Sequence, residues 1–360
     1  MNFANSFKIN NTKVGKNFPV YFIADIAANH DGELERAKKL ISLAKDSGAD
    51  AVKFQHHNVK KYVSDFGFKS LGNKFSHQKK WKKSIFEVYK DAQVPTDWTS
   101  HLSDYCKKIN IDFFSTPYDL EMVDHLESFN VPAYKIGSGD VSWYAMLKKV
   151  ASTTKPIIIA SGASTIEEVE KSMAIISDNN QNIVLMQCNT NYTASIDNFK
   201  FINLNVLQTY KKLFPNVVLG LSDHTHGDVT VLGAVALGAR IIEKHFTDDN
   251  ERVGPDHIFS MNPYTWKEMI DKTRLLEAAL GSSVKKIEDN EKETVILQRR
   301  CIRVTKDLEK HDMIDFNNIE FQRPAPEDSL NPNEIERILN KKINKSILKG
   351  DYLKKENIIW

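Results

Sequence analysis

Two histidines near the ends of short apolar segments have the chemistry and spacing of metal ligands. His224 follows the segment 217–222, and His245 lies near the end of the segment 240–246. Adjacent strands lie about 4.8 Å apart, so bonds of about 2.0–2.3 Å from the two imidazoles could meet at one ion. This ligand set, completed by water and oxygen atoms, suits Mn²⁺, with Mg²⁺ or Co²⁺ as alternatives. Asp256 is near enough in sequence to the last segment to assist metal binding through water. The competing interpretation of each histidine is an ordinary structural hydrogen bond.

Two lysines lie inside apolar segments, where a charge needs a partner. Lys53 belongs to the segment 51–55 and Lys135 to the segment 133–138. Burying an ammonium group without an anion is strongly unfavourable. We therefore predict a bound anion beside them, with a carboxylate of the protein itself as the alternative. Three serines also lie at segment ends, where serine commonly caps the following helix: Ser138, Ser161 and Ser222.

Three carboxylates near the same segment ends could transfer protons. Asp25 lies in the first apolar segment, Glu243 lies in the last, and Asp256 follows the last. Side chains two residues apart in a strand share one face, so Gln55 and Lys53 should point the same way. General acid–base catalysis requires such groups within hydrogen-bond reach of a substrate. Sequence alone does not rank the three carboxylates.

These residues must be positioned by eight short apolar segments separated by amphipathic helical patterns. The segments are too continuous for half-exposed strands and are typical of buried parallel strands. Their alternation with helices predicts a (β/α)8 TIM barrel, in which the active site lies at the carboxyl ends of the strands. A doubly wound sheet is the alternative, although the first strand–helix turn lacks the dinucleotide-binding glycine pattern. The expected strands are 20–27, 51–55, 112–116, 133–138, 157–161, 183–188, 217–222 and 240–246, and helical patterns cover 33–47, 165–178, 205–214, 229–237 and 263–280.

The composition changes after the last of these helical patterns. We predict a barrel domain at 1–281, a charged linker at 282–294 and a small domain at 295–360. A domain of about 65 residues has a thin core, so we expect it to dock onto something larger.

The connection between the second and third expected strands is unusually long for a barrel. It covers 56–95, contains Trp81, and has a helical pattern at 84–92. A long loop of this kind is typical of an active-site lid or rim.

Charge and cysteine content exclude several classes of protein. Lys and Arg number 49 and Asp and Glu 47, a net charge of +2 that does not support nucleic-acid or anionic-membrane binding. Three widely spaced cysteines do not suit a disulfide framework or a thiolate zinc site. We find no secretory signal and no apolar run of about 20 residues. A cytoplasmic enzyme is the expectation.

Together the motifs resemble the sialic acid synthase family, whose members condense phosphoenolpyruvate with an amino-hexose to nine-carbon 2-keto-3-deoxy acids. The resemblance implies a TIM barrel followed by an antifreeze-like domain of the β-clip type, matched by RRCIRVTKDL (299–308) and FQRPAP (321–326). The barrel motifs are IADIAANHDG (23–32), GADAVKFQ (48–55), FFSTPYD (113–119), YKIGSGD (134–140), ASGAST (160–165), LSDHT (221–225), GARIIEKHFTDD (238–249) and VGPDHIFS (253–260).

The resemblance also implies a role for each matching residue. A divalent metal, typically Mn²⁺, would lie on His224 and His245. The antifreeze-like domain of a partner subunit would cover the barrel and insert an arginine matched by Arg323, so a domain-swapped homodimer is implied. The expected catalytic residues are Asp25, Tyr192, Glu243 and Asp256, some of which also contact the sugar, and the expected substrate-binding residues are Lys53, Gln55, Lys135, Ser138, Ser161, Thr190, Ser222 and Arg323.

Two departures from the family pattern concern the sugar side. Asp25 stands where the family usually has Glu, Thr190 where it has Asn or Ser, and Thr193 where it has Pro. The amino-hexose that accepts phosphoenolpyruvate therefore need not be N-acetylmannosamine. A 2,4-diamino sugar that leads to a legionaminic-type acid is also a candidate. A synthase acting on a phosphorylated sugar and a non-catalytic glycan-binding barrel are the competing hypotheses.

Overall fold

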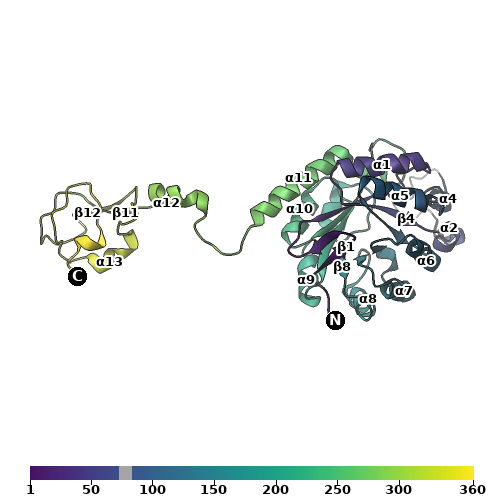
Figure 1. The fold of residues 1–360 in the computed structure, drawn as a ribbon, viewed down its shortest axis with the longest axis horizontal. Coiled ribbons are helices and arrows are strands. Elements are labelled where there is room, and N and C mark those ends of the chain that lie inside the picture. Colours follow the sequence, from purple (N-terminus) through teal and green to yellow (C-terminus); the bar gives the residue numbers. More distant parts are fainter. Residues whose placement is uncertain (73–82) are drawn as a thin grey trace. The chain divides into compact units, whose positions relative to one another are not determined.

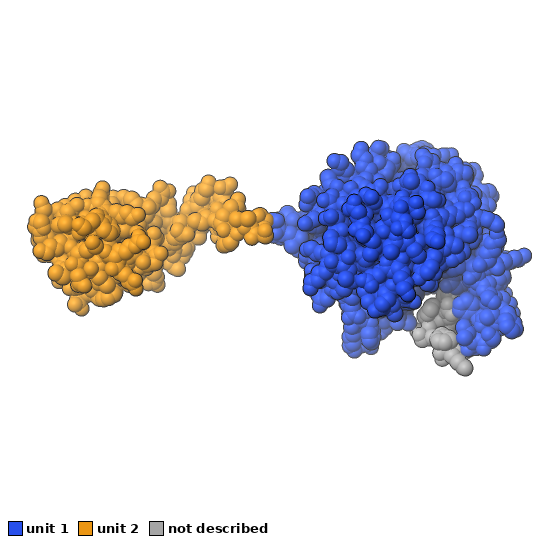
Figure 2. All heavy atoms as spheres, turned by 90° about the horizontal axis from the view of Figure 1, so that it is seen from below, with its two compact units in different colours: residues 1–281 blue, residues 282–360 orange. Residues whose placement is uncertain are grey.

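The chain forms two compact units in this computed structural model, which describes residues 1–72 and 83–360. Unit 1 comprises Met1–Gly281 and unit 2 comprises Ser282–Trp360 (Figure 2). Trp81 of the long connection lies outside the described residues. Within those two ranges, no helix combines the length and the apolar character that crossing a membrane requires.

Unit 1 is built around a closed barrel of eight parallel strands (Figure 1). The hydrogen-bonded order β10-β3-β4-β5-β6-β7-β8-β9 follows the chain once around the ring. Every residue of β3, β7, β8, β9 and β10 is buried, as expected for parallel strands that are covered on both faces. The predicted (β/α)8 barrel is confirmed. The strands are β3 (Tyr21–Asp25), β4 (Ala51–His56), β5 (Asp112–Pro117), β6 (Tyr134–Ile136), β7 (Ile157–Ala160), β8 (Ile183–Cys188), β9 (Val218–Asp223) and β10 (Ile241–His245).

Helices surround the strands because each has one apolar face to bury (Figure 1). In α1, the buried positions Ala37, Leu40, Ile41 and Ala44 recur at helical spacing. Helix α8 begins with a capping box in which Thr165 is the N-cap. The surrounding helices are α1 (Leu34–Asp46), α5 (Trp98–Ile109), α6 (Leu120–Ser128), α7 (Tyr144–Ser152), α8 (Ile166–Ser177), α9 (Val206–Leu213), α10 (Val229–Ala236) and α11 (Pro263–Leu280), with short 3₁₀ turns η3 (Ser138–Asp140), η4 (Ile196–Phe201) and η5 (His257–Phe259).

Two parts of unit 1 lie outside the barrel repeat. An antiparallel hairpin of β1 (Ser6–Ile9) and β2 (Thr12–Gly15), which we did not predict, precedes the first barrel strand. The long connection contains α2 (Val59–Tyr62), α3 (Asp65–Leu71) and α4 (Ile85–Asp91). The last of these lies where the helical pattern predicts it.

Unit 2 has a small core of its own, made mostly of isoleucine and leucine. Helix α12 (Lys292–Gln298) continues past residue 294, where the sequence places the end of the linker. The other elements are β11 (Cys301–Val304), antiparallel to β12 (Ile319–Gln322), with α13 (Ile335–Ile338) and the 3₁₀ turns η6 (Asp289–Glu291), η7 (Pro332–Glu334) and η8 (Lys355–Asn357).

Candidate active site

Ionisable side chains gather at the carboxyl ends of the barrel strands. Asp25 ends β3, Lys53 lies in β4, Lys135 in β6, and Glu243 and His245 in β10. All five are buried, with exposures between 2% and 7%. Charged residues are seldom buried unless they are paired, so their partners determine what the site can do.

Lys53 is paired with the carboxylate of the neighbouring strand. Its Nζ donates to Oδ2 of Asp25 at 2.7 Å and, at 3.4 Å, to Oγ1 of Thr116 on β5. The register of β3 and β4 places Asp25 directly opposite Lys53. Gln55 donates to the same Oδ2 at 3.4 Å, and the amide of Ala27 donates to Oδ1 at 3.1 Å. Three groups therefore hold the carboxylate of Asp25 in place. A glutamate here would carry its carboxylate one methylene further from the backbone.

Lys135 is paired with a carboxylate on the opposite side of the barrel. Its Nζ lies 3.1 Å from Oε1 of Glu243, and Nζ of Lys53 lies 3.9 Å from the same oxygen. The hydroxyl of Ser222 also donates to Oε1, at 3.2 Å. The two lysines thus have protein carboxylates as partners. Their burial therefore does not by itself require the bound anion that we predicted. It matches the alternative, in which carboxylates of the protein itself are the partners.

The three carboxylates of the site titrate differently because their surroundings differ. Burial alone would raise the pKa of Glu243, but the ammonium groups of Lys135 and Lys53 lower it to about 2. Burial raises the pKa of Asp25 and Asp256, against the opposing effects of Lys53 and His245, respectively. Glu243 is therefore the firmly ionised member of the three.

The serines predicted from strand ends occupy different environments. The hydroxyl of Ser161 donates to the carbonyl of Met186 at 2.8 Å and accepts from Tyr210 at 2.7 Å. It does not cap α8, since Thr165 does. Ser138, at the start of η3, accepts from the amide of Gly162 at 3.0 Å. Ser161 therefore lies at the turn that follows β7, and Ser138, which follows β6, contacts the same turn.

Gly162 allows three elements to meet closely at that turn. A Cβ atom on this residue would lie 2.7 Å from Cγ2 of Thr190 and 2.9 Å from Oγ of Ser138. Cys188, at the end of β8, would lie 3.2 Å away. A glycine is needed here because no side chain fits, and without a side chain both Ser138 and Thr190 can approach its backbone.

The two histidines predicted as metal ligands lie side by side. The ring centroids of His224 and His245 are 5.3 Å apart, and Tyr192 lies 4.4 Å from the ring of His224. Phe259 contacts all three rings. Burial lowers the pKa of both histidines, that of His224 to about 3, so both are neutral at pH 7. Neutral imidazole is the form that binds metals.

The nitrogen atoms of these rings fit a divalent cation. Nδ1 of His224 lies 2.9 Å from the carbonyl of Asn189, an arrangement that makes Nδ1 the donor and leaves Nε2 free to coordinate. Nδ1 of His245 is buried without a hydrogen-bond partner. Oδ2 of Asp25 and Oδ2 of Asp256 lie 3.6 Å from Nε2 and Nδ1 of His245, respectively. In the described residues, no three His, Cys, Asp or Glu side chains converge as a closed metal site, so any ion here would have open coordination positions.

Asp256 lies in the loop after β10, which is hydrogen-bonded to the turn after β3. The amide of Ala28 lies 3.4 Å from Oδ2 of Asp256. Asn29 donates to the carbonyl of Phe246 and to Ser260, both at 2.9 Å. Ser260 in turn donates to the carbonyl of Asp256 at 2.7 Å.

Sequence reasoning omitted Asn29, Thr116 and Phe259 from the predicted site residues. Asn29 and Thr116 carried a usable signal, since each follows or ends an apolar segment. Phe259 carried none, because its place beside the histidines depends on how the loop after β10 folds back.

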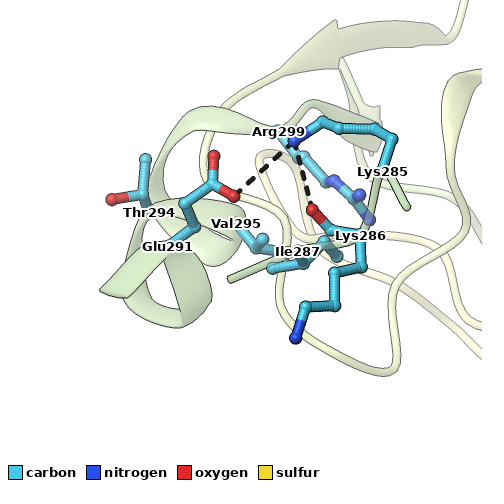
Figure 3. A pocket seen from close by; sticks show the side chains of 7 residues that line it. All are labelled: Lys285, Lys286, Ile287, Glu291, Thr294, Val295 and Arg299. Carbon is cyan, nitrogen blue, oxygen red and sulfur yellow. Dashed lines mark hydrogen bonds and ion pairs between the residues drawn. The ribbon is translucent and has the colours of Figure 1, made fainter. Parts of the chain in front are cut away.

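Arg323 is the one predicted site residue that belongs to unit 2. It is an exposed residue of unit 2, directly after β12. Unit 2 also has an open hollow of about 410 Å³ lined by residues 285–299 (Figure 3). There Lys285 reaches Glu291 and the carbonyl of Lys286. None of the predicted site residues lines this hollow.

A closed parallel barrel with charged residues at its carboxyl ends defines a TIM-barrel protein with an enzyme-like site. The NeuB family matches residues 40–285, and this chain belongs to that family, the sialic acid synthases. An uncharacterized protein of Methanocaldococcus jannaschii is 36% identical over 98% of this chain and 97% of its own length. The N,N'-diacetyllegionaminic acid synthase of Campylobacter jejuni is 36% identical over 84% of this chain and 90% of its own length.

Solved structures agree with this assignment. The spore coat polysaccharide biosynthesis protein SpsE of Bacillus subtilis aligns over 99% of both chains, with 31% identity and a TM-score of 0.65. The N-acetylneuraminic acid synthetase of Leptospira borgpetersenii, in complex with citrate, covers 82% of this chain and 96% of its own, with 28% identity and a TM-score of 0.71.

Proposed function

We propose that this protein condenses phosphoenolpyruvate with an N-acyl amino-hexose to give a nine-carbon 2-keto-3-deoxy acid and phosphate. The observation that carries the proposal is the convergence, at one end of the barrel, of two buried lysines with two adjacent neutral histidines. Lysines supply charge for an anionic donor, and the histidines suit a Lewis-acidic ion that would polarise an aldehyde. Membership of a family of such synthases supports the same conclusion.

The lysines and serines form the donor end of the site. Lys53 and Lys135 would exchange their present partners, Asp25 and Glu243, for the carboxylate and phosphate of phosphoenolpyruvate. Charge-assisted hydrogen bonds of this kind are the strong ones. Ser138, Ser161 and Ser222 lie at the ends of the neighbouring strands and would complete the contacts.

The histidines and carboxylates form the acceptor end. His224 and His245 would hold the divalent metal, for which we propose Mn²⁺, and the ion would supply Lewis acidity toward the aldehyde of the open-chain sugar. Tyr192, which packs on His224, would orient the sugar together with Gln55 and Thr190. Asp25, Glu243 and Asp256 would accept or return protons.

The bond changes follow from the two substrates. C3 of phosphoenolpyruvate forms a carbon–carbon bond to the aldehyde carbon, whose oxygen is protonated to a hydroxyl. Water adds to C2, and its proton is taken up by a carboxylate of the site. The C2–O bond to phosphate then breaks, and the proton of the C2 hydroxyl passes to the leaving phosphate. The products are the 2-keto group and inorganic phosphate.

We propose that unit 2 is an antifreeze-like domain that acts in trans. Arg323 would contact the N-acyl group of a sugar held in the barrel of a partner subunit, which requires a homodimer. The exposure of Arg323 and its place after β12 leave its guanidinium accessible for such a contact.

The acceptor is the part of the proposal that needs the most direct test. Relatives are named as synthases of legionaminic, pseudaminic and N-acetylneuraminate-9-phosphate products. We propose an unphosphorylated N-acyl amino-hexose, either N-acetylmannosamine or a 2,4-diacetamido sugar. Phosphate release from phosphoenolpyruvate should be measured with each sugar and with a phosphorylated sugar, before and after chelation and Mn²⁺ addition. Release with one unphosphorylated amino-hexose supports the proposal; no release with any sugar contradicts it.

A further inference from the structure

A fully buried ion pair joins the two strands that carry the histidines. Asp223 of β9 and Lys244 of β10 stand opposite each other in register, and Nζ of Lys244 donates to Oδ2 of Asp223. The two side chains are 0% and 1% exposed. Each immediately precedes a histidine in the chain: His224 in the first case and His245 in the second. Because side chains alternate along a strand, this pair lies on the outer face of the barrel, away from the site in its interior.

The partners of this ion pair are concentrated around His224. Oδ1 of Asp223 accepts from the amide and hydroxyl of Thr225, at 3.2 and 3.0 Å. Nζ of Lys244 donates to the carbonyl of Thr225 at 2.7 Å. The hydroxyl of Thr230 in α10 donates to Oδ2 of Asp223 at 2.7 Å. Both residues that flank His224 are therefore tied to the next strand or to the covering helix.

Stability alone does not account for a charged pair at this place. Removing both charges from water is costly, and apolar side chains of similar size often replace a buried ion pair without loss of stability. Directed hydrogen bonds, in contrast with apolar contacts, set the orientation of the peptide groups that they join. Here those groups are the amide and carbonyl of Thr225, immediately after His224.

We propose that Asp223 and Lys244 are positioning residues whose ion pair sets the distance and direction between the imidazoles of His224 and His245. The pair thereby determines how tightly the site binds a divalent cation. The inference rests on the metal site of the proposed function. Neither residue touches the ion or the substrates.

The test is a titration of the full-length protein with MnCl₂ alone, in which free Mn²⁺ is followed by electron paramagnetic resonance. Lys244→Met should weaken Mn²⁺ binding by about 10- to 100-fold, the range found when groups that orient metal ligands are removed. It should also lower the melting temperature, because Asp223 is left buried and unpaired. Asp223→Asn/Lys244→Met has no lone charge, so its melting temperature should recover while its Mn²⁺ affinity stays low.

Two controls separate positioning from general damage. Lys155→Met removes a lysine paired with Glu127 at the amino end of β7, away from the histidines, and should bind Mn²⁺ like the wild type. His224→Ala defines the signal of a lost site. If Lys244→Met does not fold, the Mn²⁺ affinity of the double variant tests the proposal instead.

Each remaining outcome has a definite meaning. The positioning role is overturned if the folded double variant binds Mn²⁺ as tightly as the wild type. It is also overturned if the Mn²⁺ affinity of the double variant recovers together with its melting temperature. Absence of Mn²⁺ binding by the wild type refutes the metal site of the proposed function and this inference with it. Normal wild-type binding with unchanged variants refutes the inference alone.

Discussion

Nζ of Lys135 and Oε1 of Glu243 lie 3.1 Å apart, although their strands stand on opposite sides of the eight-stranded ring. The contact spans the barrel interior and joins a residue of the proposed donor end to a residue of the proposed acceptor end. Because Glu243 also lies near Lys53, the donor and acceptor ends share one cluster of charges. Binding of an anionic donor should therefore change the surroundings of the carboxylates that face the sugar.

Replacing Lys135 should weaken the interaction with phosphoenolpyruvate. Lys135→Met removes an ammonium group and leaves Glu243 with Lys53 and Ser222 as partners. Loss of one member of a buried charge contact costs about 2–5 kcal/mol, so the KM for phosphoenolpyruvate should rise at least tenfold. Phosphate-release kinetics measure it. Lys149→Met, which breaks a pair with Asp124 on the outside of the barrel, is the control; an unchanged KM in the Lys135 variant would refute its role.

The metal assignment predicts a sharp difference between two nearby histidines. His224→Ala should reduce turnover more than about 100-fold, because Lewis-acid stabilisation is worth several kcal/mol. His226→Ala, two residues later at an exposed position, should leave turnover nearly unchanged. Circular dichroism should show both variants folded. A His224 variant that remains active and insensitive to chelators would exclude the metal role.

Arg323 should act on the sugar and not on the donor. A hydrogen bond from a charged donor is worth about 1.5–3 kcal/mol, so Arg323→Ala should raise the KM for the amino-hexose about 10- to 100-fold and leave that for phosphoenolpyruvate unchanged. Arg337→Ala changes another exposed arginine of unit 2 and serves as the control. The covering role of unit 2 is wrong if sugar KM and kcat are both unaffected.

Stability below pH 4 should depend on Asp248, next to the loop that follows β10. Nη1 and Nη2 of Arg36 donate to its carboxylate, at 3.0 and 2.6 Å. Burial opposes ionisation, but Arg36 and Lys39 lower the pKa of Asp248 below its ordinary value of 3.8. A lowered pKa contributes stability above pH 4 that is lost as the pH falls, when the folded protein must take up the proton.

Asp248→Asn should therefore flatten the decline of the unfolding free energy between about pH 4 and 2. Urea unfolding at a series of pH values measures it. Asp97→Asn, at an exposed carboxylate before α5, is the matched control. If the curves of wild type and Asp248→Asn run parallel, the ion pair does not contribute in this way.

Sequence reasoning predicted the barrel because its signal is local and repeated. Eight continuous apolar segments separated by amphipathic helices leave few other ways to bury both faces of every strand. The hairpin of β1 and β2 was not predicted because it is short and largely polar. Its signal was the pair Asn10-Asn11 between two alternating runs, and Asn10 does adopt a positive φ of 50°.

The candidate site could be predicted only in part. Adjacent histidines follow from strand order, since β9 and β10 must be neighbours when the barrel closes in sequence order. The partners of the lysines do not follow from order. Lys53 takes its partner from the adjacent, preceding strand and Lys135 takes its partner from across the ring. Such a choice depends on side-chain reach inside a closed barrel.

The amino-acid sequence by itself determined the order of the strands, the family and the set of polar residues at the strand ends. Tertiary structure alone decided which charges meet. The physical reason is that hydrophobic burial is non-directional and periodic, so it is visible in a linear pattern. The partner of a buried charge, in contrast, is set by separations of a few ångströms across the barrel, as between Lys135 and Glu243.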